Sequence, residues 1–267
     1  YLSRFPRPEI TIRTLLNHRS GLPNYVHYME KLGWNKKQRV TNEDVLSFII
    51  KNHKLIGIAP NNRRFSYSNT NYALLALVIE KVSGKFMGDY LKETIFEPLG
   101  MKDTYLYTLA DSARSMSSYY LNGKTFAFNF LDLVYGDKNI YSTPRDLLRF
   151  DRGLKTSMIL KGPILDSAYM PYSFERSGTG NYGLGWRMHL IENGKKIIYH
   201  NGWWHGNRTS FIRLLEEDVT IITLCNNDDM KVYSAKRLAD IFGDYRQHDD
   251  DAPVLVKRSG ASKKKST

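Results

Sequence analysis

Cysteine is nearly absent from this sequence of 267 residues, since Cys225 is the only one. A single thiol cannot form an internal disulfide, and no Cys-x-x-Cys pair is available for zinc. The His-Glu-x-x-His pattern is missing too, and His200 and His205 have no third candidate ligand nearby in the sequence. We therefore expect no metal site and no cofactor.

Long hydrophobic runs are also lacking. The longest covers residues 72–79, which is far too short to cross a bilayer as a helix. Hydrophobic residues make up 42% of the chain and charged residues 25%, as in ordinary globular proteins. The sequence predicts one globular domain over residues 1–243, without a transmembrane segment.

Acidic residues are in deficit, with 27 against 39 lysines and arginines, and the net charge is +12. Part of this excess lies in residues 244–267, where the hydrophobic periodicity ends. We interpret this segment as a disordered basic tail. The remaining basic residues are scattered rather than gathered with aromatic residues on one element, so we expect no nucleic-acid partner.

Two common enzyme signatures are missing. No Gly-x-Ser-x-Gly occurs, which excludes a nucleophile elbow of the α/β-hydrolase type. The stretch "GTGNYG" (178–183) has the spacing of a dinucleotide-binding loop, but a polar segment precedes it and no helix follows. We expect a flexible turn there, leading into a strand at Leu184.

The first two-thirds of the chain show helical patterns. Helix signals predict segments at residues 12–17, 41–51, 71–82, 89–96 and 143–153. Thr11 and the Thr41-x-x-Asp44 pair are candidate N-terminal caps, and Pro144 suits a first helical turn. Gly84 is a stop signal for the third of these helices.

The last third changes to a strand-like period. "GLGWRMHLIE", "KKIIYHNGW", "RTSFIRLLEE" and "DVTIITLCNN" are β-rich runs joined by short turns, followed by a predicted helix at residues 232–242. Short links force neighbouring strands to be antiparallel. Helices followed by an antiparallel sheet indicate an α+β fold.

Tyr67 and Asn69 stand two residues apart before an apolar helix, and His200 lies at the end of a predicted strand. Taken singly, each is a weak signal. An aromatic residue before a helix is more often part of the core, and a histidine at a strand end usually makes only a hydrogen bond. Gly202, two residues after His200, would let a ligand backbone approach closely. A site between a helical body and a sheet edge would use both segments.

Six segments in a fixed order carry a family resemblance. They are "ITIRTLLNHRSGLPNY" (10–25), "FSYSNTNYALLALVIEKVSG" (65–84), "IFEPLGMKDTYL" (95–106), "IYSTPRDLLRF" (140–150), "YGLGW" (182–186) and "HNGWWHG" (200–206). Together they resemble the serine β-lactamase-like hydrolases, which include class C β-lactamases, D-alanyl-D-alanine carboxypeptidases and related esterases. The resemblance covers about residues 9–243 and implies a β-lactamase/DD-peptidase-like fold.

The resemblance implies roles for single residues. Tyr67 would be the proton shuttle and Asn69 the amide that holds the substrate. His200 would be the first side chain of the family's third motif, a Lys-Thr-Gly or His-x-Gly on the edge strand of the sheet. Asn201 and Gly202 would complete the substrate-binding strand, and the backbone N–H of Trp203 would serve the oxyanion hole. A histidine in place of the third-motif lysine brings a group with a pKa near 6.5 and favours the peptidase and esterase branches.

The family nucleophile is a Ser-x-x-Lys located several dozen residues before the "ITIRTLL" segment. In this chain the pattern occurs only at Ser262-x-x-Lys265, in the basic tail, where we interpret it as spurious. One hypothesis is a fragment of a working serine hydrolase that lacks its N-terminal strands and nucleophile helix. The other is a non-catalytic binding module for cell-wall peptide, glycan or a protein partner. We favour the first, because a pseudoenzyme has no reason to keep both the Tyr-x-Asn and the His-x-Gly residues.

The substrate stays open among D-amino-acid peptides, β-lactams and small esters, and so does the oligomeric state. The family implies an extracytoplasmic location, periplasmic or secreted. In the family an N-terminal hairpin flanks the last strand, so we expect residues 219–225 to form an open sheet edge here. Ile221, Ile222 and Leu224 would then be poorly covered.

Overall fold

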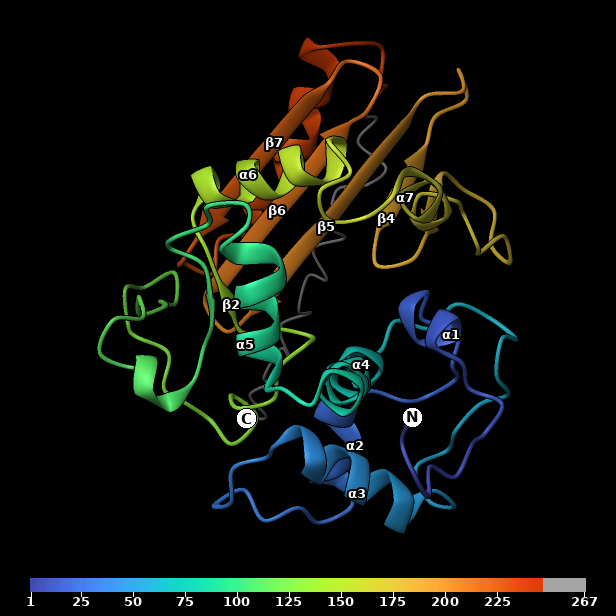
Figure 1. Cartoon of the computed structure of the whole chain (residues 1–267), viewed down its shortest axis with the longest axis vertical. Helices are drawn as coiled ribbons and strands as arrows, with labels where there is room; N and C mark the ends of the chain where they lie inside the picture. Colours follow the sequence, from blue (N-terminus) through green and yellow to red (C-terminus); the bar gives the residue numbers. More distant parts are fainter. Residues whose placement is uncertain (247–267) are drawn as a thin grey trace, which may run out of the picture.

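The protein is described by a computed structural model that covers residues 1–246 (Figure 1). Residues 247–267, most of the predicted tail together with Ser262 and Lys265, lie outside the described residues. Tyr245 lies past the predicted domain boundary at 243 and is buried, with its hydroxyl donating to Glu217.

Helices dominate the first two-thirds of the chain, as the sequence predicts. They are α1 (Ile12–Leu16), α2 (Tyr25–Lys31), α3 (Asn42–Asn52), α4 (Asn69–Ser83), α5 (Met87–Leu91), the π-helix η1 (Lys92–Phe96), the 3₁₀-helix η2 (Leu109–Asp111), α6 (Pro144–Lys155) and α7 (Gly162–Ala168). Thr11 and Thr41 form capping boxes, and Gly84 ends α4 in the left-handed conformation. None of the helices within residues 1–246 is long and apolar enough to cross a membrane.

The last third forms an antiparallel sheet of five strands, ordered β3-β4-β5-β6-β7, which confirms the predicted α+β class. Its strands are β3 (Gly180–Tyr182), β4 (Arg187–Leu190), β5 (Lys196–Trp204), β6 (Asn207–Leu214) and β7 (Val219–Cys225), and a separate pair joins β1 (Tyr105–Leu106) to β2 (Ile140–Tyr141). Within residues 1–246, β7 is an outer strand, as expected. Ile221, Ile222 and Leu224 are each half-buried.

Three local expectations need correction. The "GTGNYG" segment is not only a turn, because residues 180–182 pair with β4 as strand β3. The predicted helix at 232–242 is instead the 3₁₀-helix η3 (Met230–Ile241), and the one at 89–96 changes from α to π geometry at Lys92. Helices α2 and α7 were not predicted from the sequence.

The packing places two layers on the sheet and a helical body beside it. Helix α6 packs against β7, and η3 packs against β6 and β7; Figure 1 shows α6 in front of the sheet and η3 behind it. The helical body consists of α1 to α4, of which α1, α2 and α3 all pack against α4. Its core includes Tyr25, Met29, Ile49 and Leu74, each almost fully buried.

A buried ion pair ties α6 to the sheet. The Nε atom of Arg213 on β6 lies 2.5 Å from the Oδ1 atom of Asp151 on α6, and both side chains are almost completely buried. Arg213 also donates to the hydroxyl of Tyr169, which follows α7. The Oδ2 atom of Asp151 lies 3.4 Å from the Nζ atom of Lys155. Helix α6, strand β6 and the residue that follows α7 therefore meet at one charged network.

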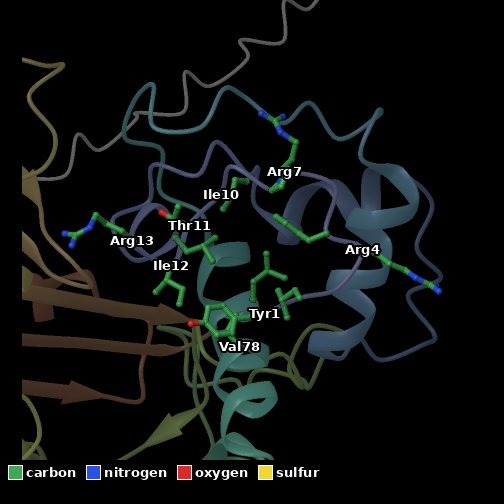
Figure 2. Close-up of a pocket in the computed structure, with 13 residues that line it drawn as sticks. Tyr1, Arg4, Arg7, Ile10, Thr11, Ile12, Arg13 and Val78 are labelled. Carbon is green, nitrogen blue, oxygen red and sulfur yellow. The ribbon is translucent and has the colours of Figure 1, made fainter.

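An apolar groove of about 600 Å³ lies between the first residues of the chain, α1 and α4. Figure 2 shows Tyr1, Ile12 and Val78 gathered around it, while Arg4, Arg7 and Arg13 extend outward. It shares no lining residue with the pocket that holds Tyr67 and His200.

Candidate active site

Tyr67, Asn69 and His200 line one pocket of about 210 Å³, although His200 is far from the other two in the sequence. Tyr67 precedes Ser68, which has an extended backbone and is the N-cap of α4, and Asn69 is the first residue of that helix. His200 lies on β5. The pocket is completed by Tyr72, Gly136, Asp137, Tyr182 and Gly185. The structure therefore brings the helical body and the sheet together at these three side chains.

His200 is oriented through both of its ring nitrogens. Its Nδ1 atom lies 2.9 Å from the carbonyl oxygen of Asn201, and its Nε2 atom lies 3.0 Å from the hydroxyl of Tyr182. A carbonyl oxygen can only accept, so the neutral ring carries its proton on Nδ1 and accepts the Tyr182 hydroxyl at Nε2. Tyr182 is part of the quoted "YGLGW" motif, but its contact with His200 needed the structure.

Burial, together with the nearby charge of Arg187, lowers the pKa of His200 to about 4. The sequence suggested a group that titrates near neutrality, and the structure moves this titration into the acid range. At neutral pH His200 is an uncharged hydrogen-bonding group rather than a substitute cation for a lysine.

The ring of Tyr67 lies close to both His18 and Arg187. Its centroid is 4.2 Å from that of His18 and 6.2 Å from that of His200, and the guanidinium carbon of Arg187 lies 5.0 Å from it. Although 40% of the residue is exposed, desolvation raises the pKa of Tyr67, Arg187 opposes this rise and Asp137 adds to it. The phenolate of Tyr67 would therefore need additional positive charge at the site.

Three residues implied by the resemblance lie beside this pocket without lining it. The Oδ1 atom of Asn201 accepts a hydrogen bond of 2.8 Å from the hydroxyl of Ser210. A Cβ atom at Gly202 would come within 2.3 Å of the Thr209 hydroxyl, so the close neighbour of this glycine is the adjacent strand. Trp203 is 65% exposed.

His18 is a residue of this site that sequence reasoning missed. It is buried, has a positive φ of 55°, and its Nδ1 atom lies 3.2 Å from the backbone nitrogen of Ser68 and 3.1 Å from the Nδ2 atom of Asn71. Desolvation, with smaller effects from His200 and Arg187, lowers its pKa to about 3. A neutral His18 therefore holds the backbone next to Tyr67. Its only signal in the sequence was its place in "NHRSGLPNY".

Asp137 is a second group that sequence reasoning missed. It lines the pocket and accepts hydrogen bonds from the hydroxyl of Tyr25 at 2.9 Å and from the Nζ atom of Lys138 at 3.2 Å. Burial raises the pKa of Asp137 and lowers that of Lys138, while each charge opposes the shift of the other. Lys138 also lies 4.4 Å from the ring of Trp204. Asp137, held by Tyr25 and Lys138, therefore forms a fixed part of the pocket lining.

The depressed pKa of His200 makes folding stability depend on pH. Unfolded histidine titrates near 6.5, so between about pH 6.5 and 4 the unfolded chain binds one more proton at this site. Stability is unaffected by this group above pH 6.5 and falls as the pH drops, by up to about 1.4 kcal/mol per pH unit. His200→Gln should make the decline shallower by about that amount.

Urea denaturation of the full-length gene product at pH 7, 6 and 5 measures this slope. His53→Gln, at an exposed histidine after α3, is the matched control. Parallel stability curves for the parent and the His200 variant would show that His200 is not buried as described.

Comparison with known proteins agrees with this architecture. The family model described as "Beta-lactamase" matches residues 1–242. Penicillin-binding protein 4* of Bacillus subtilis is 32% identical over 249 residues, which cover 87% of this chain and 55% of that protein. D-aminopeptidase of Cereibacter sphaeroides is 23% identical, over 85% of this chain and 44% of that protein. The chain thus spans about half the length of these relatives.

Solved structures show the same fold. A penicillin-binding protein from Bacillus halodurans superposes with a TM-score of 0.76 at 21% identity, over 90% of this chain and 74% of that one. The D-amino acid amidase of Ochrobactrum anthropi, in complex with D-phenylalanine, gives 0.70 at 24% identity, over 90% and 80%. Because the family model spans nearly all of the described residues, the chain belongs to the β-lactamase family.

Proposed function

We propose that this chain is part of a serine hydrolase that acts by acyl transfer on a peptide, amide or ester. The observation that carries the proposal is the single pocket lined by Tyr67, Asn69 and His200 in a member of the β-lactamase family. Relatives named as a penicillin-binding protein and as D-aminopeptidases favour peptide and amide substrates. The same relationship leads us to propose an extracytoplasmic location.

In the proposed reaction a serine hydroxyl attacks the carbonyl carbon of the substrate, and its proton must be taken up in the same step. Tyr67, as a phenolate stabilised by the positive charge of the proposed lysine, receives this proton and later returns it to the leaving group. Asn69 binds the substrate amide. His200, held by Tyr182, is neutral and completes the opposite side of the pocket. The backbone N–H of Trp203 contributes to the oxyanion hole.

The mechanism also needs a nucleophile, and residues 1–246 contain no Ser-x-x-Lys that would supply it. Ser68, beside Tyr67, is buried, and as an extended neighbour of Tyr67 it points to the opposite side. Ser20 donates to the Oδ1 atom of Asn71 and has no lysine three residues later. In the proposal the serine and its lysine belong to a part of the full-length gene product outside this sequence.

A labelling experiment tests the proposal. The full-length gene product is incubated with a fluorophosphonate or a fluorescent penicillin, and the intact mass and the modified peptide are determined. We expect one adduct on the serine of a Ser-x-x-Lys, and none on the 267-residue chain alone. A stoichiometric adduct on a serine of residues 1–246 would contradict the assignment of the nucleophile. A full-length product that binds D-alanyl peptides without adduct or turnover would favour the non-catalytic binding module.

A further inference from the structure

A second pocket, of about 360 Å³, lies next to the candidate active site. The two pockets share Tyr182 as a lining residue. Arg187 lines the second pocket, while its guanidinium carbon lies 5.0 Å from the Tyr67 ring of the first. A ligand held between Tyr67 and His200 would therefore lie beside a second cavity.

Three arginines give the second pocket its charge. Arg64 precedes the Tyr67 segment, Arg176 lies in the loop before β3, and Arg187 begins β4. Glu175 is the acidic residue in the lining, and it is already paired with Arg19. Among residues 1–246, no ion pair joins Arg64, Arg176 or Arg187 to a carboxylate. The pocket consequently carries positive charge that the described part of the protein does not neutralise.

Arg187 is the member of this set that connects the two pockets. It is half-buried, and its guanidinium also lies 5.9 Å from the Tyr182 ring. Its positive charge adds to the lowering of the pKa of His200 and opposes the rise in the pKa of Tyr67. A cation kept partly out of water without a counter-ion is costly, and a bound anion would relieve this cost.

The remaining lining residues indicate what kind of anion fits. Phe65 and Tyr199 add apolar surface, which suits a short aliphatic or aromatic stem. A guanidinium presents parallel N–H groups that match a carboxylate in a bidentate arrangement. A substrate that ends in a carboxylate on a short apolar stem would use both features.

We propose that this pocket binds a carboxylate on the acyl part of the substrate and that Arg187, with Arg176 and Arg64, determines a preference for anionic acyl groups. The inference rests on the proposed function for the position of the scissile bond. It adds a specificity-determining site that lies outside the Tyr-x-Asn and His-x-Gly residues.

Two matched substrates test this preference. Glutaryl-D-alanine 4-nitroanilide and pentanoyl-D-alanine 4-nitroanilide differ only by a carboxylate in place of a methyl group. With the full-length gene product we expect kcat/KM to favour the glutaryl compound by roughly 10- to 100-fold, the usual effect of a charge-assisted hydrogen bond. Arg187→Gln should reduce this ratio by about tenfold or more, and Arg187→Lys should leave an intermediate ratio.

The ratio between substrates separates specificity from catalysis, because Arg187 also affects the pKa of Tyr67. Arg176→Gln removes a charge from the pocket without a contact to Tyr67 and should also lower the ratio. Arg145→Gln on α6 changes the net charge equally outside the pocket and should leave the ratio as in the parent. Equal rates for the two substrates in the parent, or equal losses for both in Arg187→Gln, would overturn the proposal.

A binding measurement tests the proposed carboxylate pocket independently of the proposed hydrolysis. Calorimetric titration of the full-length product with glutaryl-D-alanine amide and pentanoyl-D-alanine amide requires no turnover. Tighter binding of the glutaryl compound that is lost in Arg187→Gln supports the pocket even if neither anilide is hydrolysed, in which case only the proposed reaction fails. Equal affinities for the two amides would overturn the pocket while leaving the hydrolase proposal intact.

Discussion

Replacement of Tyr67 by phenylalanine in the full-length gene product should lower the rate of acyl-enzyme formation by about 10²- to 10⁴-fold, the range that general acid–base groups supply. The proposed step moves a proton from the serine and back to the leaving group, and phenylalanine cannot carry it. The rate is followed with a D-alanine 4-nitroanilide or a small ester, and adduct formation is followed by mass.

The fold should survive this change. The rings of Tyr67 and Phe occupy the same space, so the contacts with His18 at 4.2 Å and with Arg187 at 5.0 Å are retained. Within residues 1–246 the Tyr67 hydroxyl has no hydrogen bond to lose. The thermal midpoint should therefore stay within a few degrees of the parent.

Tyr120→Phe is the matched control, because it removes a phenol hydroxyl from a residue that is 44% exposed and stacks on Phe126. This variant should keep the parent rate. A loss below threefold in Tyr67→Phe, with the control behaving as expected, would make Tyr67 a structural residue and remove the acid–base part of the proposed mechanism.

The predictable parts of the fold depend on signals that are local in the sequence. Thr11 and Thr41 cap helices because their side chains reach backbone N–H groups three residues away, and this spacing is visible in the sequence. Gly84 ends α4 for a similarly local reason. The short turns between residues 183 and 227 likewise require antiparallel neighbours, so the order β4 to β7 followed from the sequence.

Segments without such signals were mispredicted. Strand β3 has three residues, two of them outside the usual strand formers, and is defined by its pairing with β4 rather than by its composition. The predicted helix near residue 232 has the apolar spacing of an α-helix but forms the 3₁₀-helix η3 against β6 and β7. In both cases tertiary packing decides the local conformation.

The candidate site also contains residues that the sequence predicts and residues that only the structure identifies. Tyr67, Asn69 and His200 belong to motifs, and the structure places them in one pocket. His18, Asp137 and Arg187 contact or line the same region, but each acquires its position from partners that are distant in the sequence. In the sequence Arg187 is an ordinary charged residue of a predicted strand, and only the structure shows the ring of Tyr67 beside it.

Substitution of Asp151 by asparagine should destabilise the full-length protein by about 3–5 kcal/mol, because breaking a buried ion pair leaves an uncompensated charge. Arg213 is almost completely buried, and with Asp151 neutral its remaining side-chain partner is the hydroxyl of Tyr169. For a domain of this size the thermal midpoint should fall by about 10 °C or more. Denaturant unfolding of the purified variant measures the loss of free energy.

Two further variants show whether the stability loss comes from breaking the buried ion pair or from the loss of a charge alone. Lys155→Met removes the partner at the Oδ2 atom of Asp151, but Lys155 is partly exposed and also pairs with Asp218, so the cost should be below about 1 kcal/mol. The double change Asp151→Leu with Arg213→Met removes both buried charges together, and it should be less destabilising than Asp151→Asn. If Asp151→Asn unfolds no more easily than Lys155→Met, the link between α6 and β6 is hydrated rather than buried. Strand β6 pairs directly with β5, which carries His200, along the whole segment from Ile198 to Trp204. In that case this part of the sheet is supported by strand pairing and apolar packing, and not by the ion pair.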